Sequence, residues 1–154
     1  MALTLEQTRT KLMAIEPNYD ELVKLGREAI PFLETLVSDP NAFVAAKAAY
    51  LASLIQDPRS QGILEKAARS ADPRVRMAAA AGVGNLRGQV PERLLVSFLE
   101  DPNLGVRKLA LKSLPTTVTA RLRERVAALT IADPNPDLRS LAKEILPRLG
   151  SRPQ

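Results

Sequence analysis

The chain has 154 residues, about the size of one domain, and its 45% hydrophobic and 25% charged residues are typical of a folded protein. It contains no Cys, which excludes disulfides and thiolate chemistry, and no His, which removes the commonest general base and metal ligand. Residues 1–77 carry ten basic and ten acidic side chains, whereas residues 78–154 carry twelve and seven, so the net charge of +5 lies in the second half. Aromatic residues make up only 3%, and a core built from Leu, Ile, Val and Ala suits closely packed helices.

The N-terminal segment predicts a short helical cap. Thr4-Leu5-Glu6-Gln7 forms a capping box that begins a helix reaching to about Ile15, and residues 18–24 predict a second short helix. We expect no signal peptide, because no apolar stretch follows a basic one, and no apolar run approaches the roughly 20 residues that span a bilayer. The expected protein is therefore cytoplasmic and makes no membrane contact. Residues 1–25 would cap the helical array that follows, whose end otherwise exposes its core.

Four segments of the chain align without gaps, and their first residues are 31, 31 and 32 positions apart. Each begins with a branched aliphatic residue and carries an Ala four residues later. Residues four apart stack on one helical face, and a small residue there lets a neighbouring helix approach closely. We predict that these residues form a buried seam between two helix layers: Val44, Ala48, Val75, Ala79, Val106, Ala110, Leu138 and Ala142.

A break that contains Pro precedes each aligned segment. In repeats one, three and four an Asp-Pro pair begins five residues before the aligned aliphatic, whereas repeat two has Asp72-Pro73 closer to Val75 and Ser70 at the equivalent place. Pro ends the preceding helix but is tolerated in the first turn of the next, which Asp or Ser can cap. Each break therefore marks a corner between two helices. The first helices of the four pairs are predicted over residues 30–37, 63–68, 94–99 and 122–131.

These features resemble the HEAT repeats, particularly the short bacterial type described in phycobilin lyases. The resemblance rests on the Asp-Pro corners, on the Val-Arg-x-x-Ala pattern of the second helices, and on Leu25-Gly-Arg-Glu-Ala-Ile-Pro31, and it covers about residues 26–149. It implies an all-α, right-handed α-solenoid of about four HEAT-like helix pairs behind the cap. Ala45 departs from the pattern, which has Arg there. The implied repeats span residues 26–56, 57–88, 89–118 and 119–150, with a tail at residues 151–154.

The resemblance also implies that the second helices line a concave face that binds a partner. Two and six residues after each aligned aliphatic, side chains should point away from the core; the first two repeats offer small residues with one Tyr and one Met there, and the third offers two Lys. An exposed Tyr and Met beside small residues suit a protein partner, although filling space between repeats explains them equally well. The candidate partner-binding residues are Tyr50, Met77, Ala46, Ala81, Lys108, Lys112, Arg76 and Lys143.

An Arg follows the aligned aliphatic in repeats two, three and four. HEAT proteins commonly pair this Arg with a corner Asp, so the resemblance implies a structural role for Arg107 and Arg139. Their six-residue spacing from Asp101 and Asp133 fits such pairs, which stabilise only modestly when they are partly exposed. We predict that the two Asp cap their second helices or bond these two Arg, in a ladder that is interrupted at Ala45.

The basic second half offers an alternative function, nucleic-acid binding, because a basic groove that follows phosphates gives strongly salt-dependent affinity. Residues 99–154 contain no Phe, Tyr or Trp, however, so the stacking side chains of single-strand binders are missing. Acidic neighbours such as Glu124 and Glu144 favour solvated helix faces instead. The basic side chains in question are Arg107, Lys108, Lys112, Arg121, Arg123, Arg125, Arg139, Lys143 and Arg148.

Little in the sequence indicates catalysis. The glycine-rich stretch from Gly82 to Gly88 follows a helix rather than a strand, so we expect a helix end and a turn instead of a phosphate-binding loop. No acidic cluster has metal-ligand spacing, and no Ser has a His to activate it. We therefore expect no enzyme activity, no cofactor and no metal. The leading hypothesis is a bacterial adaptor, scaffold or accessory subunit that binds a protein; nucleic-acid binding is second, and a non-catalytic subunit of a modification enzyme is third.

Overall fold

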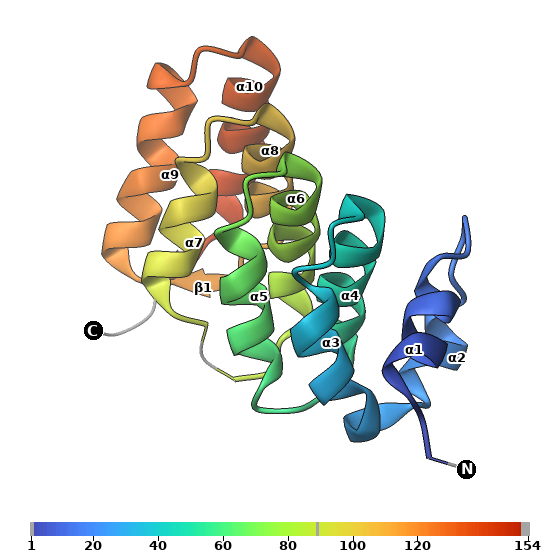
Figure 1. Cartoon of the computed structure of the whole chain (residues 1–154). Helices are drawn as coiled ribbons and strands as arrows, with labels where there is room; N and C mark the ends of the chain where they lie inside the picture. Colours follow the sequence, from blue (N-terminus) through green and yellow to red (C-terminus); the bar gives the residue numbers. More distant parts are fainter. Residues whose placement is uncertain (1, 89, 152–154) are drawn as a thin grey trace. The chain divides into compact units, whose positions relative to one another are not determined.

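The computed structural model describes residues 2–88 and 90–151 and divides into two compact units, Met1–Gln89 and Val90–Gln154 (Figure 1). The division lies next to the predicted boundary between the second and third repeats. The described residues are mainly helical, which confirms the all-α fold of paired helices behind an N-terminal cap. No described helix combines the length and the apolar character that crossing a membrane requires.

The first unit contains the cap and two helix pairs. Helices α3 and α5 form one layer and α4 and α6 the other, with each neighbouring pair in contact. Figure 1 shows the two pairs in blue to green along the chain. The elements are α1 (Leu5–Leu12), α2 (Tyr19–Val23), η1 (Gly26–Ala29), α3 (Ile30–Leu36), α4 (Ala42–Leu54), α5 (Ser60–Ala68), α6 (Pro73–Gly82) and η2 (Val83–Asn85).

The second unit contains two further pairs. Helices α7 and α9 contact each other, α8 and α10 contact each other, and each second helix also packs on its own first helix. A short parallel ladder pairs Thr117 with Gly150 and Val118 with Ser151, so the predicted tail begins in a strand; its residues 152–154 lie outside the described part. The elements are α7 (Glu92–Leu99), α8 (Leu104–Lys112), β1 (Thr117–Val118), α9 (Ala120–Ala132), α10 (Pro136–Ile145), η3 (Leu146–Arg148) and β2 (Gly150–Ser151).

The core of both units is the predicted seam. All eight aligned residues are buried, and each is at most 2% exposed. Leu, Ile and Val side chains of the first helices pack against this surface, among them Leu33, Ile63 and Leu95. Burying these aliphatic groups stabilises the pairs by roughly 1.5–3 kcal/mol for each fully buried large side chain. The repeat phase predicted from the aligned segments is therefore confirmed.

The N-terminal cap forms largely as predicted. Thr4 and Gln7 make the capping box, and Asn18 caps α2. Helix α1 ends at Leu12 rather than near Ile15, and Pro17 lies shortly beyond, where it disfavours helical geometry in the residue before it. Gly26 has a φ of +62°, a left-handed conformation that favours glycine, where the chain turns from α2 into the first repeat.

Asn, rather than the Asp that was predicted, caps the second helix of repeats one, three and four. The side chains of Asn41, Asn103 and Asn135 accept backbone N–H groups in the first turn. The preceding Asp in each corner accepts the N–H of that Asn instead, as Asp101 does at 2.8 Å. In repeat two Ser70 and Asp72 take these two roles. The corner is therefore a two-step hydrogen-bond relay that positions the helix start.

Candidate functional site

The outward positions of α4 and α6 form the second-helix face of the first unit, defined by Ala46, Tyr50, Met77 and Ala81. All four side chains are partly exposed, and the two helices that carry them pack side by side. Between the helices lies the seam, in which Ala48 and Ala79 are completely buried. Small seam residues bring the helix axes close together, so the outward side chains form one surface.

Tyr50 departs from the exposed position expected of it. It is half-buried, and its ring packs edge-to-face on Tyr19 of the cap, with ring centroids 5.1 Å apart. Burial, and secondarily the neighbouring Tyr50, raise the pKa of Tyr19 above its ordinary value. Such a pair stabilises by about 0.5–1.5 kcal/mol beyond the burial itself. Tyr50 therefore packs the cap against α4 and fills space between the cap and the first repeat, rather than between repeats as the alternative role predicted.

An apolar hollow of about 350 Å³ lies between the end of α1 and the start of α4, a feature that the sequence analysis did not predict. Its rim carries three large apolar side chains that are mostly exposed: Met13 at 52%, Ile15 at 94% and Phe43 at 58%. The guanidinium of Arg74 in α6 stacks over the Phe43 ring, 4.7 Å from its centroid. Exposed apolar side chains that gather in one place are typical of interaction surfaces. The helical spacing of Leu12 and Val44 gave no sign of it, because Met13 and Ile15 lie beyond the end of α1 and Phe43 lies in the first turn of α4.

In the second unit the predicted lysines are accessible. Lys112 and Lys143 are exposed and Lys108 is half-exposed. Lys112 also lines an open hollow of about 370 Å³ between α8 and α10, which has an apolar floor that includes Leu111 and Leu141. Glu144 and Arg148 line the same hollow and pair with each other at 3.0 Å. The structure thus brings Lys112 together with α10, but Lys143 does not line this hollow.

Several basic side chains of the second unit are already bound within it. Arg125 pairs with Glu100, and Arg148 with Glu144. Arg107 pairs with Asp133 at 2.9 Å, and its side chain is only 11% exposed. Arg121 and Arg123 lie on α9, in the other helix layer from Lys108 and Lys112. The nine basic residues of the nucleic-acid hypothesis therefore do not form one continuous strip of accessible cations within this unit.

The predicted ladder exists, but its pairing is corrected. The guanidinium of Arg107 donates to the carboxylate of Asp133 in the next repeat, at 2.9 and 3.2 Å. Toward its own corner, Arg107 reaches the backbone carbonyl of Asp101 rather than its carboxylate, and Arg139 likewise binds the carbonyl of Asp133. The carboxylate of Asp101 faces Asn103, as described above. The six-residue spacing therefore predicted proximity correctly and the partner atoms incorrectly.

The ladder also extends into the cap, which the sequence analysis missed. Arg9 of α1 holds the carboxylate of Asp39 through two bonds, at 2.8 and 3.3 Å. This Arg9 contact is the main cause that lowers the pKa of Asp39, while burial opposes it. Arg9 thus does for the first corner what Arg107 does for the last. The link arises because α1 packs against α3 and the corner that follows it, and no sequence pattern specified this packing.

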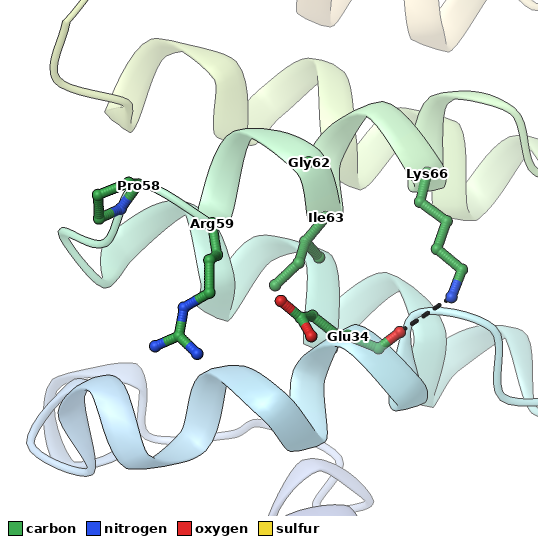
Figure 2. A pocket seen from close by; sticks show the side chains of 6 residues that line it. All are labelled: Glu34, Pro58, Arg59, Gly62, Ile63 and Lys66. Atoms are coloured by element: carbon green, nitrogen blue, oxygen red, sulfur yellow. Dashed lines mark hydrogen bonds between the residues drawn. The ribbon is translucent and has the colours of Figure 1, made fainter.

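A further hollow, of about 450 Å³, lies between α3 and α5 in the other layer of the first unit (Figure 2). Lys66 points across it and donates to the backbone carbonyl of Glu34 at 3.0 Å. Arg59 lies at its other end, where it also binds Asp57 at 2.9 Å. With Ile63 on its floor, the hollow combines one carboxylate with two cations that are already bound. No cluster of metal-ligating side chains is found among residues 2–88 and 90–151.

Comparison with known proteins assigns the repeats. The family model that describes HEAT repeats matches residues 61–147, more than half of the chain. The chain belongs to the HEAT-repeat family. Among solved structures, it is similar to a chain of the complex of CpcE and CpcF of phycocyanin lyase from Nostoc sp. PCC7120, with a TM-score of 0.73. The two are 23% identical, and the match covers 92% of this chain and 96% of that one, which shows a shared fold. No curated protein sequence matches the chain significantly.

HEAT membership accounts for the corner geometry and points to a protein-interaction scaffold. In this chain the corner Asp and the second-helix Arg connect successive repeats, as Arg107 and Asp133 do. The seam and the corners together hold the helix pairs, and the outward positions are left for recognition. Fold alone does not specify which molecule is recognised, so the partner must be argued from the surface.

Proposed function

We propose that this HEAT-repeat chain is a non-catalytic accessory module that binds a protein partner through the second-helix face of its first unit. The observation that carries the proposal is the gathering of exposed apolar side chains around α4. Met77 and Ala81 flank one side of this helix, and the hollow rimmed by Ile15 and Phe43 lies at its start. A surface of this kind gains free energy when a partner's apolar side chains cover it.

The solved relative supports the accessory role. It belongs to a complex of two proteins of a phycocyanin lyase, and it aligns with this chain over nearly its full length. A module of the same size and fold in a modification enzyme is consistent with a subunit that assembles with a second protein. The chemistry would then belong to the assembled enzyme, and the present chain would supply contact surface.

The proposal is tested by placing a charge on the surface. Met77→Glu and Ile15→Glu should each weaken capture of the partner at least tenfold, because the new carboxylate would be desolvated at the interface. Ile15 is almost fully exposed, so its substitution leaves the fold intact. The matched control is Thr35→Glu on the exposed side of α3, in the other helix layer.

The measurement has two steps. The partner is first recovered by affinity capture from cell lysate and identified by mass spectrometry, and its affinity for each purified variant is then measured by calorimetry. Circular dichroism melts confirm that each variant is folded. Equal affinities of Met77→Glu, Ile15→Glu and Thr35→Glu would move the interface away from α4 and overturn the proposal.

A further inference from the structure

The four corners present equivalent backbone carbonyl groups, and three of them bind an Arg of their own repeat. In repeat two, Nη1 of Arg76 donates to the carbonyls of Ser70 and Ala71 at 3.0 and 3.2 Å. In repeat three, Nη1 of Arg107 donates to those of Asp101 and Pro102 at the same two distances. One guanidinium nitrogen therefore bridges two successive carbonyls at each of these corners.

Repeat four follows the same rule with fewer bonds. Nη1 of Arg139 donates to the carbonyl of Asp133 at 2.6 Å. No carboxylate is found within bonding distance of Arg139 among the described residues. A guanidinium therefore occupies this kind of corner even when the carbonyl is its main partner.

Repeat one lacks the Arg but keeps the acceptors. Ala45 stands at the Arg position, and within residues 2–88 and 90–151 no group donates a hydrogen bond to the carbonyl oxygen of Asp39 or Pro40. The space is left open as a hollow of about 600 Å³ that Asp39, Pro40, Ala45 and Ser70 help to line. Ser70 stands where the other corners have Asp. The Arg position of repeat one and the Asp position of repeat two, which would pair as Arg107 and Asp133 do, are thus both occupied by small residues, and the hollow between them is open to the surface.

The charges that line this hollow balance one another. Asp39 is held by Arg9, and Asp72 by Arg74 at 2.7 Å. Lys66 is turned toward the carbonyl of Glu34, as Figure 2 shows, and Arg69 is exposed on the rim. In the lining alone the two carboxylates and two cations are equal in number, but both carboxylates are also paired with an Arg outside it, so no net negative charge attracts a cation at long range. Recognition must therefore come from short-range geometry, which the two free carbonyls supply.

We propose that this hollow, the corner slot, binds the guanidinium of an arginine side chain supplied by another protein. The incoming Nη group would bridge the carbonyls of Asp39 and Pro40, as Arg107 bridges those of Asp101 and Pro102. Arginine fits better than lysine because its planar fork presents donors at fixed angles, whereas an ammonium is a compact and strongly hydrated charge. That the arginine belongs to a protein partner rests on the proposed function; the slot itself rests only on the repeat geometry.

The test is a titration followed by backbone NMR, with N-acetyl-arginine amide as the probe. The amides of Asn41, Ala45 and Ala71, which surround the slot, should shift in a saturable way with a Kd in the millimolar range, as expected for a few charge-assisted hydrogen bonds. The citrulline analogue, which has the same shape without the charge, and N-acetyl-lysine amide should bind at least fivefold more weakly. Equal shifts with all three probes, or none with arginine, would overturn the proposal.

Two variants sharpen the test. Ala45→Arg should place its own guanidinium in the slot and abolish the arginine shifts, while a melt confirms that it is folded. Arg139→Ala should open an equivalent vacancy at the fourth corner, so that arginine amide now also shifts residues around Asp133. Absence of a new site in Arg139→Ala would show that an emptied corner does not bind guanidinium.

The outcome is separable from that of the proposed function. Met77→Glu leaves the slot untouched and should titrate with arginine amide as the unmodified chain does. Loss of partner binding in Met77→Glu with unchanged arginine shifts would support the second-helix face and the slot independently. Arginine shifts without any effect of Met77→Glu on the partner would retain the slot and reject the face.

Discussion

Arg107 and Asp133 form a deeply buried ion pair, with side chains only 11% and 2% exposed. Taking two charges out of water costs free energy, and their attraction repays it only when the remaining donors and acceptors are satisfied. Here they are, because Arg107 also binds two corner carbonyls and Asp133 also accepts the N–H of Asn135. We therefore expect the net contribution of the pair to folding stability to be smaller than the free-energy cost of removing one of its two partners.

Arg107→Ala should lower the free energy of unfolding by about 3 kcal/mol, because it leaves the Asp133 carboxylate buried without its cation. Arg148→Ala is the matched control, since its ion pair with Glu144 is more than 60% exposed on both sides and should contribute under about 1 kcal/mol. Urea denaturation measures both. In the double variant with Asp133→Asn, part of the loss should be recovered; an equal loss in Arg107→Ala and Arg148→Ala would contradict the buried-charge explanation.

Asp57 links acid stability to one corner of the first unit. The side chain and backbone N–H of Arg59 bind its carboxylate, and together with the more distant Arg27 they lower the pKa of Asp57 from 3.8 to about 2, against the effect of burial. The folded state thus holds its proton less tightly than the unfolded state does. The resulting stabilisation is present above pH 3.8 and is lost as the pH falls through about 2.

Asp57→Asn should therefore reduce the loss of stability over this acidic range. The variant is expected to melt at a lower temperature than the unmodified chain at neutral pH, because Arg59 loses its charged partner. The difference between the two melting temperatures should narrow as the pH is lowered from 3.8 toward 2. Thermal melts at a series of pH values check this, and a difference that stays constant with pH would show that Asp57 does not contribute through its charge.

At the scale of the helices, the contact of α4 with α6 depends on Gly82. A Cβ atom at Gly82 would lie 2.8 Å from both the Cβ and the Oγ of Ser53, which is completely buried. Ser53 is itself fixed, since it donates to the carbonyl of Tyr50 at 2.6 Å and accepts from Asn85 at 3.1 Å. The ends of α4 and α6 approach each other closely here, and because Ser53 is fixed by these hydrogen bonds they have little room to move apart.

Gly82→Ala should cost about 1–3 kcal/mol, because the overpacking outweighs the gain in helix propensity. Gly62→Ala offers a control of opposite sign: it lies in the exposed face of α5 with no atom within 4 Å of the added Cβ, and should stabilise by up to about 1 kcal/mol. Adding Ser53→Gly to Gly82→Ala should restore part of the loss. If Gly82→Ala stabilised the protein as Gly62→Ala is expected to, the two helices could move apart without cost, which would contradict this prediction.

The helix pairs were predictable because their signal is local and repeated. The seam follows from an aliphatic residue and an Ala four positions apart, and every aligned pair is buried, from Val44 to Ala142. The ladder was only half predictable, since the spacing of Asp101 and Arg107 fixes their distance along the chain but not which repeat supplies the carboxylate. The role of Arg9 and the Tyr19–Tyr50 contact depend on how the cap packs, which no periodicity encodes.

At the scale of the whole chain, the charge excess and the apolar surface lie in different units. Residues 90–154 carry eleven basic and seven acidic side chains, a net +4 of the total of +5, whereas Met13, Ile15, Phe43 and Met77 belong to the first unit. A positive field attracts acidic partners and increases association rates without fixing the bound geometry. We therefore expect the second unit to influence how fast a protein partner arrives, and the apolar surface of the first unit to determine how long it stays.

This division predicts how the chain behaves with nucleic acid. In a gel shift with mixed-sequence DNA and RNA, we expect at most weak binding at roughly 50 mM salt and none at roughly 200 mM, the range over which phosphate contacts lose most of their strength. Internal ion pairs at Arg107, Arg125 and Arg148 leave few cations on any one face of the second unit. Lys108→Ala with Lys112→Ala should remove whatever shift is seen at low salt, whereas the same change at Arg121 and Arg123 on α9 tests whether the second layer contributes.

With a protein partner the double lysine variant should slow association and leave dissociation unchanged, which surface plasmon resonance measures directly. A micromolar shift that persists at the higher salt, together with a slope of log K against log salt that flattens by about two in the lysine variant, would make nucleic acid the partner instead.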